Sequence, residues 1–165
     1  MLIYKFYLMK ILKKIGFALL LILIVAQFFG PEKNDGNIDT VNAFVAETNP
    51  TEEVLSIMKT SCFDCHSAKT NYPWYNSITP VNYWLDDHIK DGKKHLDFSK
   101  WSEYSLKKKE HKMDELHEEV EKGEMPLDSY TWTHDEANLT QEQVDAIVTW
   151  GKKVQAEYKQ QMSAE

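Results

Sequence analysis

The sequence predicts an all-α domain of about four main helices with long aromatic loops, preceded by an apolar helix at the N-terminus. No segment shows a convincing period of two, whereas several place apolar residues at helical spacing. Cap and stop residues fall at the ends of those segments. The first 30 residues differ in composition, since they carry four lysines, no acidic residue and a continuous apolar run.

That apolar run, residues 15–29, follows a pair of lysines and precedes an acidic stretch. The order predicts a membrane anchor or a signal peptide within residues 1–30, and in both cases the remainder is exported. The run is shorter than the roughly 20 residues of a full span, but the neighbouring apolar residues extend it. No small-residue cleavage pattern follows it, which favours an uncleaved anchor in the inner membrane through residues 11–29. A buried core helix is the remaining alternative.

Residues 31–50 are predicted to be a linker, because they lack a clear period and are rich in Gly, Pro, Asn and Asp. Residues 51–162 are predicted to form the folded domain, on the periplasmic side. All 19 basic residues of the chain are lysines, against 26 acidic residues. Because phosphate binding requires a basic face, this balance argues against nucleic acid as a partner.

Caps and stops define four predicted helices. They begin at Asn49-Pro50, at Thr79-Pro80, at Ser105 and at Thr140, and Gly92 and Gly123 end the second and third. Gln143 is the expected capping-box partner in the last helix, and a close helix crossing would explain the glycine at 151. Trp150 is expected to support the crossing of the first and last helices, and residues 96–104 to form a turn with apolar anchors. Such long loops leave little core, which a large apolar cofactor would supply.

The only two cysteines lie in the segment Cys62-Phe63-Asp64-Cys65-His66. A disulfide across two intervening residues would constrain the unfolded chain very little. A thioredoxin-like redox pair expects a βαβ context, which is absent. Structural zinc usually takes four ligands from two paired clusters, and only one cluster is present here.

The fourth interpretation is covalent haem, because C-x-x-C-H is the c-type attachment signature. The spacing lets Cys62 and Cys65 form thioethers with the two vinyl groups of one porphyrin. His66 then lies under the iron as its proximal ligand. Covalent attachment also suits an exported protein, which would otherwise lose the cofactor. We therefore predict one covalently attached haem c.

A distal iron ligand is expected on a loop between helices, and the segment Gly123-Glu124-Met125-Pro126 provides one. The proline stiffens the loop and directs the thioether of Met125. The alternative is a core methionine, since methionine commonly fills gaps in cores. His88, His95 and His134 are the rival distal ligands.

Aromatic residues follow the attachment motif closely. Tyr72, Trp74 and Tyr75 are expected to wall the haem and offer donors to a propionate, or else to anchor the loop in the core. The other tryptophans, Trp84, Trp101 and Trp132, are expected to pack rather than to bind. Lys107–Lys109 are expected to be solvated, with a docking patch as the alternative.

The order CFDCH, GEMP and LTQEQVDAIVTWGKK resembles a class I c-type cytochrome. More narrowly, the chain resembles a bacterial family of small exported haem-binding domains, which combines CxxCHS, a PWY loop, LxFSxW and G-x-MP. The resemblance covers residues 51–156 and implies a cytochrome c-like fold around a haem. It implies haem binding, with electron transfer assumed. Because the chain has no arginine, propionate partners must be Lys, Trp, Tyr, Asn or backbone groups.

The predicted function is therefore a membrane-tethered mono-haem c-type cytochrome domain that transfers electrons to redox partner proteins on the periplasmic side. Catalysis is not expected, because His66 and Met125 fill both axial positions. The alternative function is a haem-based sensor or small-ligand-binding module in which NO or CO displaces Met125. A haem-free metal or structural domain is the third hypothesis.

Overall fold

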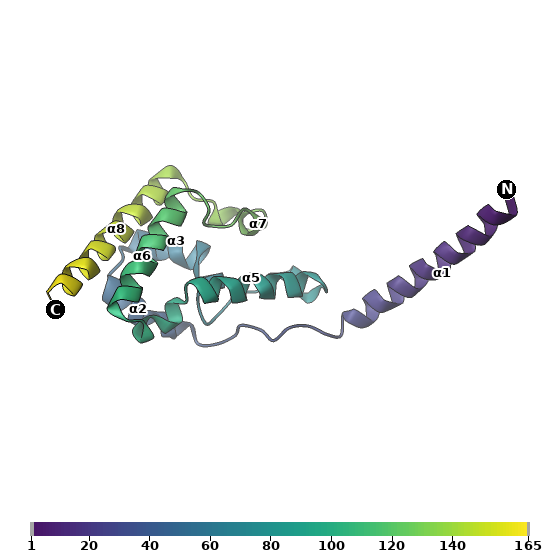
Figure 1. Cartoon of the computed structure of the whole chain (residues 1–165), viewed down its shortest axis with the longest axis horizontal. Coiled ribbons are helices and arrows are strands. Elements are labelled where there is room, and N and C mark those ends of the chain that lie inside the picture. The colour runs from purple at the N-terminus through teal and green to yellow at the C-terminus, as the bar shows by residue number, and fades with distance from the viewer. Residues whose placement is uncertain (1, 165) are drawn as a thin grey trace. The chain divides into compact units, whose positions relative to one another are not determined.

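The computed structural model describes residues 2–164. All regular secondary structure in that range is helical, and no strand is present there. The elements are α1 (Leu2–Ala26), η1 (Ile38–Val41), α2 (Asn42–Thr48), α3 (Glu52–Ser61), α4 (Phe63–His66), η2 (Trp74–Ser77), α5 (Val81–His95), η3 (Phe98–Glu103), α6 (Leu106–Glu121), α7 (Asp128–Thr131), η4 (Asp135–Ala137) and α8 (Gln141–Ser163), where η denotes a 3₁₀ helix (Figure 1). The predicted all-α class is confirmed.

The chain divides into two compact units. Unit 1 combines the residues up to 33 with residues 72–88, and unit 2 combines residues 34–71 with the residues from 89 onward. Helix α5 contributes its first part to unit 1 and its last part to unit 2.

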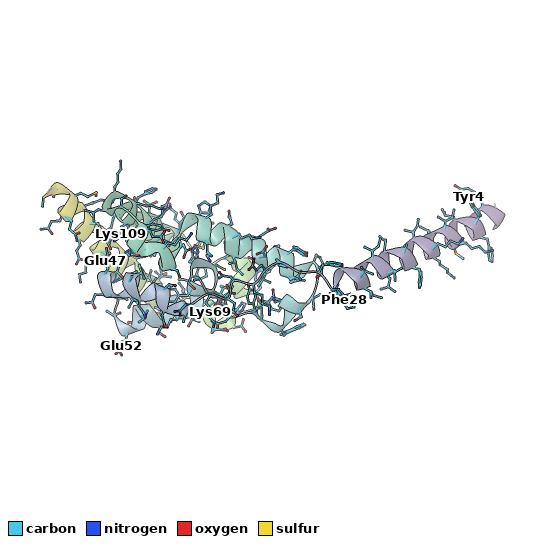
Figure 2. All side chains as sticks on the ribbon, turned by 90° about the horizontal axis from the view of Figure 1, so that it is seen from below. Tyr4, Phe28, Glu47, Glu52, Lys69 and Lys109 are labelled. Atoms are coloured by element: carbon cyan, nitrogen blue, oxygen red, sulfur yellow. The ribbon has the colours of Figure 1, made fainter. Side chains whose placement is uncertain are left out.

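Unit 1 contains α1, whose apolar side chains are exposed along its length (Figure 2). The end of α1 is joined to the loop before α5, where Gln27 exchanges two hydrogen bonds of 3.0 Å with the backbone of Thr79. No helix among residues 2–164 combines the length and apolar character needed to cross a membrane. The predicted membrane anchor therefore remains a prediction.

The core of unit 2 lies between α2, α3, η3, α6 and α8, and α6 and α8 form its most extensive helix pair. Aromatic rings occupy its centre. Phe44 of α2 lies 4.5 Å from Phe98 and 4.9 Å from Trp101, measured between ring centroids. All three side chains are almost fully buried. The expectation that residues 96–104 supply apolar anchors to the core is therefore confirmed.

Residues 38–48, which the sequence placed in a linker, instead form η1 and α2. Phe44 is completely buried, so this segment belongs to the core. Helix α3 also begins later than expected. Thr51 caps it by accepting a hydrogen bond from Val54 N at 3.2 Å, whereas Asn49 ends α2 with a φ of 42°. Helix α2 is too short to show a period, which is why its pattern was missed.

Helix α5 continues through Gly92 to His95, although the sequence predicted that Gly92 would end it. The glycine has a different cause. A Cβ at this position would lie 3.0 Å from the carbonyl oxygen of Cys65 and 3.2 Å from its Cβ. Gly92 therefore lets α5 approach the cysteine motif closely.

Several local predictions are confirmed. Ser105 caps α6, Gly123 follows it with a φ of 74°, and Thr140 and Gln143 form a capping box on α8. Gly151 marks a close crossing, since an added Cβ would lie 2.9 Å from Cβ of His117 on α6. Trp150 is buried, but its indole donates to the carbonyl of Thr48 at the end of α2 at 3.1 Å, rather than to the first predicted helix.

Candidate functional site

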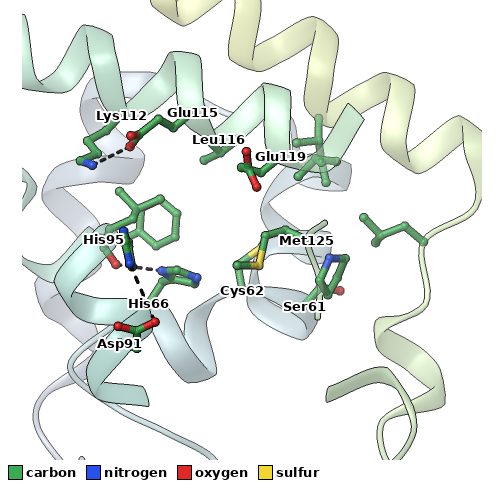
Figure 3. A pocket seen from close by; sticks show the side chains of 16 residues that line it. Ser61, Cys62, His66, Asp91, His95, Lys112, Glu115, Leu116, Glu119 and Met125 are labelled. Carbon is green, nitrogen blue, oxygen red and sulfur yellow. Dashed lines mark hydrogen bonds and ion pairs between the residues drawn. The ribbon is translucent and has the colours of Figure 1, made fainter. Parts of the chain in front are cut away.

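Unit 2 contains a cavity of about 440 Å³ at the ends of α3, α4 and α5, closed by α6, α8 and the loop after α6 (Figure 3). This volume lies within the roughly 300–1,000 Å³ typical of ligand pockets. Apolar side chains form most of its walls, from Leu96, Phe98, Leu116, Val120, Leu139 and Ile147. Such a pocket suits a largely apolar ligand.

Three predicted site residues line this one cavity: Cys62, His66 and Met125. Figure 3 shows that Cys62 and His66 reach it from the end of α3 and from α4, and Met125 from the loop that follows α6. The fold thus brings the attachment motif and the methionine segment together. Cys65 precedes His66 in the sequence but does not line the cavity. Its backbone and Cβ pack against Gly92 of α5.

His66 is held in one orientation and one tautomer. Its Nδ1 lies 2.9 Å from the carbonyl oxygen of Leu96. Because a carbonyl only accepts hydrogen bonds, Nδ1 carries the proton of the neutral ring and Nε2 keeps a free lone pair. Burial lowers the pKa of His66, which keeps the ring neutral. Metal-ligating histidines are typically oriented by such a bond.

The two cysteines are free thiols in electrostatic surroundings that disfavour thiolates. Burial, with a smaller contribution from Cys65, raises the pKa of Cys62 to about 12. Burial, together with Asp64, raises the pKa of Cys65 to about 11. No group of three or more His, Cys, Asp or Glu residues within the described range is arranged to hold a metal ion, as structural zinc would need. The site therefore gives the zinc alternative no support.

Asp64, between the two cysteines, connects the motif to two other segments. Its Oδ1 accepts hydrogen bonds of 3.0 Å from the backbone and side-chain amides of Asn71. Its Oδ2 accepts one of 3.0 Å from the hydroxyl of Tyr130 in α7. Burial and the neighbouring carboxylate raise the pKa of Tyr130, so the phenol stays a donor. Sequence analysis missed this contact, since the two residues are far apart in the chain.

Met125 is positioned mainly by the helix that precedes it. Its amide donates to the carbonyl of Glu119 at 3.2 Å, and the amide of Glu124 donates to the same oxygen at 2.9 Å. The left-handed conformation of Gly123 turns the chain at this point. The local sequence GEMP thus directs the turn, whereas the Met125 side chain packs against an apolar cluster that includes Ile57 and Ile147 from other helices.

The aromatic residues after the motif belong to unit 1, and none of them lines the cavity in unit 2. Trp74 is 80% exposed and contacts Tyr75 edge to face at 5.8 Å. The ring of Tyr72 lies 5.6 Å from the ammonium of Lys33. Their predicted role as haem walls stays a prediction.

Of the rival distal ligands, only His95 lines the cavity. His88 is in unit 1, and His134 stacks on Tyr130 with ring centroids 4.1 Å apart. Among the remaining tryptophans, Trp101 is buried as expected, whereas Trp84 and Trp132 are exposed. The Lys107–Lys109 run is partly engaged, since Lys109 pairs with Glu47 at 2.8 Å and Lys108 lies over the ring of Tyr104.

A model of the haem-binding domain family matches residues 21–153, most of the chain. The chain therefore belongs to the haem-binding domain family. The comparisons found no match among curated proteins or solved structures. The residues of the cavity fit a haem, because a neutral histidine with a free Nε2 and a thioether both line an apolar pocket. A cysteine thiol lies on the same wall.

Proposed function

We propose that this chain is a mono-haem c-type cytochrome domain with a cytochrome c-like arrangement around the cofactor. One observation carries the proposal: His66 and Met125, far apart in sequence, line the same apolar cavity together with Cys62. Membership of the haem-binding domain family supports the cofactor. The attachment motif favours the covalent form of the cofactor.

In this proposal, Cys62 and Cys65 would hold the porphyrin by thioethers, and His66 Nε2 and Met125 Sδ would bind the iron. Leu96 orients the imidazole by its bond to Nδ1. The bound haem supplies one-electron chemistry, with a potential that depends on axial ligands, burial and nearby hydrogen bonds. A methionine ligand raises that potential relative to a second histidine.

Electron transfer is favoured over catalysis by the pair of axial donors. With both axial positions filled, no coordination site remains for oxygen or peroxide. We therefore propose a carrier that exchanges electrons with redox partner proteins, rather than an enzyme.

The test is haem staining of the full-length protein on a denaturing gel, followed by visible spectroscopy. We expect a stained band, a reduced α-band of covalent haem and the weak ferric charge-transfer band of methionine–iron bonding. The Cys62→Ala/Cys65→Ala double variant should lose the stained band. An unstained wild-type protein, expressed with a haem maturation system, would refute covalent attachment.

A haem-based sensor is the second candidate function, and the way Met125 is held favours it. The backbone turn that carries Met125 is tied to α6 through a single carbonyl, that of Glu119, and the Met125 side chain packs only partly buried against the apolar cluster that includes Ile147. A small ligand that bound the iron would have to displace the thioether from this packing. Binding of CO to the reduced protein at neutral pH separates the two functions. Slow or absent binding supports the carrier, and rapid binding supports the sensor.

Residues 11–29 are proposed to tether the domain to the inner membrane, with the remainder in the periplasm. The lysines before the apolar run and the acidic stretch after it support this orientation. Membrane fractionation and the intact mass of the mature protein test the proposal. A protein that lacks residues 1–30 and fractionates with the soluble periplasm would instead be a secreted product.

A further inference from the structure

We propose that Lys112 and His95 bind the two propionates of the haem at the polar edge of the cavity. This inference rests on the proposed haem binding and names the residues that orient the cofactor. Because the chain contains no arginine, the sequence limited the propionate partners to Lys, Trp, Tyr, Asn or backbone groups. Lys112 belongs to that set, whereas His95 extends it.

The positions of the two side chains support the assignment. Lys112 projects from α6 and His95 from the end of α5, and both line the cavity. Apart from the proximal His66, they are the basic side chains among its lining residues. In Figure 3 both lie toward the left side of the pocket, with Cys62 and Met125 to their right. Propionates directed to this edge leave the apolar porphyrin against the aliphatic walls.

Both bases already lie beside carboxylates, which have the same chemistry as a propionate. Lys112 is paired with Glu115, and His95 lies 3.8 Å from Asp91. The Lys112 side chain is only 14% exposed, so its stem is held while its ammonium stays near the cavity. His95 is 68% exposed, which suits the solvent-facing edge of a haem.

Each acid has a second basic neighbour, so it keeps a partner when its first base turns to a propionate. Glu115 also pairs with His111 at 3.1 Å, and Asp91 also lies 4.0 Å from Lys94. A propionate can therefore take over Lys112 while Glu115 keeps His111. In the same way, His95 can turn to the second propionate while Asp91 keeps Lys94.

The local charge makes Lys112 the more important of the two. Asp91, Glu115 and Glu119 also line the cavity, so a propionate without a cationic partner would face carboxylates. Lysine stays charged at any physiological pH, whereas histidine is charged only when it is protonated. We therefore expect the loss of Lys112 to have the larger effect.

Resonance Raman spectra of the full-length holoprotein test the inference, because the propionate bending band reports hydrogen bonding to these groups. We expect the band to shift in Lys112→Gln and, by less, in His95→Gln. Lys152→Gln is the matched control, since Lys152 pairs with Glu121 on the surface and does not line the cavity. The reduction potential should also fall in Lys112→Gln, because a positive charge that disfavours ferric iron is removed.

A second measurement leaves Lys112 unchanged. In the full-length Cys62→Ala/Cys65→Ala variant, haemin should bind at least about tenfold more tightly than its dimethyl ester, which cannot pair with a cation. Equal binding of haemin and its ester, or a propionate band that does not move in Lys112→Gln, would overturn the inference and leave the haem site intact. A wild-type protein without haem would overturn the proposed function as well.

Discussion

The two sides of the cavity are constructed in different ways. On the side of His66, the contacts come from distant parts of the chain: Leu96 orients the ring, and Gly92 packs against Cys65. On the side of Met125, the main backbone contacts come from Glu119, within the preceding turn. The two proposed iron donors thus differ in how their backbones are placed. The turn of Met125 is held by local hydrogen bonds, although its side chain packs against apolar residues of α3, α6 and α8.

The difference suggests a division of roles. A ligand held by several distant contacts is expected to stay in place when the loop moves. A ligand held by its own turn moves with that turn, because segments with few buried contacts open at low free energy. We therefore expect the proposed coordination to change more readily on the methionine side, and the predictions below test this contrast.

The largest effect is expected from removing the proximal ligand. His66→Ala should abolish the haem-stained band, because it breaks the C-x-x-C-H signature at which haem is attached. Met125→Ala should keep a band of about wild-type intensity. Densitometry of stained gels, normalised to protein, makes the comparison, and equal loss in the two variants would remove the distinction between the sides.

The next effect concerns the coordination of a haem that remains bound. Met125→Ala should eliminate the ferric charge-transfer band and allow rapid CO binding to the reduced protein. Met162→Ala, near the end of α8, is the matched control and should leave both properties unchanged. Retention of the charge-transfer band in Met125→Ala would show that another residue is the distal ligand, with His95 the candidate inside the cavity.

Two Gly→Ala variants, one on each side of the cavity, allow the two sides to be compared by their free energies of unfolding. Gly92→Ala should lower the free energy of unfolding by about 1–3 kcal/mol, because its Cβ would meet the backbone of Cys65. Gly123→Ala should cost about 1–2 kcal/mol, through its positive φ alone, since no atom lies within 4 Å of the added Cβ. Urea unfolding of both variants provides the values. A smaller loss for Gly92→Ala than for Gly123→Ala would contradict the view that the proximal side is the more tightly constrained.

The smallest effect is expected where the two sides are joined. Tyr130→Phe removes the hydroxyl that donates to Asp64, and should lower the free energy of unfolding by about 0.5–1.5 kcal/mol. Because α7 follows the methionine segment, CO binding to the reduced protein should also become faster. The exposed Tyr83→Phe serves as the control. An unchanged CO-binding rate would show that this hydrogen bond does not restrain Met125.

Local chemistry explains what could be predicted from the sequence. The caps of α6 and α8, the turn at Gly123 and the candidate ligands in CFDCH and GEMP all depend on residues a few positions apart. The all-α class depends on apolar spacing along single helices. These features could be inferred because neighbours in sequence are neighbours in space.

Tertiary structure decided the remainder. It made Phe44 a core residue in a segment that looked like a linker, and it turned Gly92 from a helix stop into a point of close approach. It brought Lys112, His95 and Leu96 to the cysteine motif, and it placed Trp74 in the other unit. Each outcome depends on contacts between residues distant in sequence, which no local pattern of spacing or composition contains.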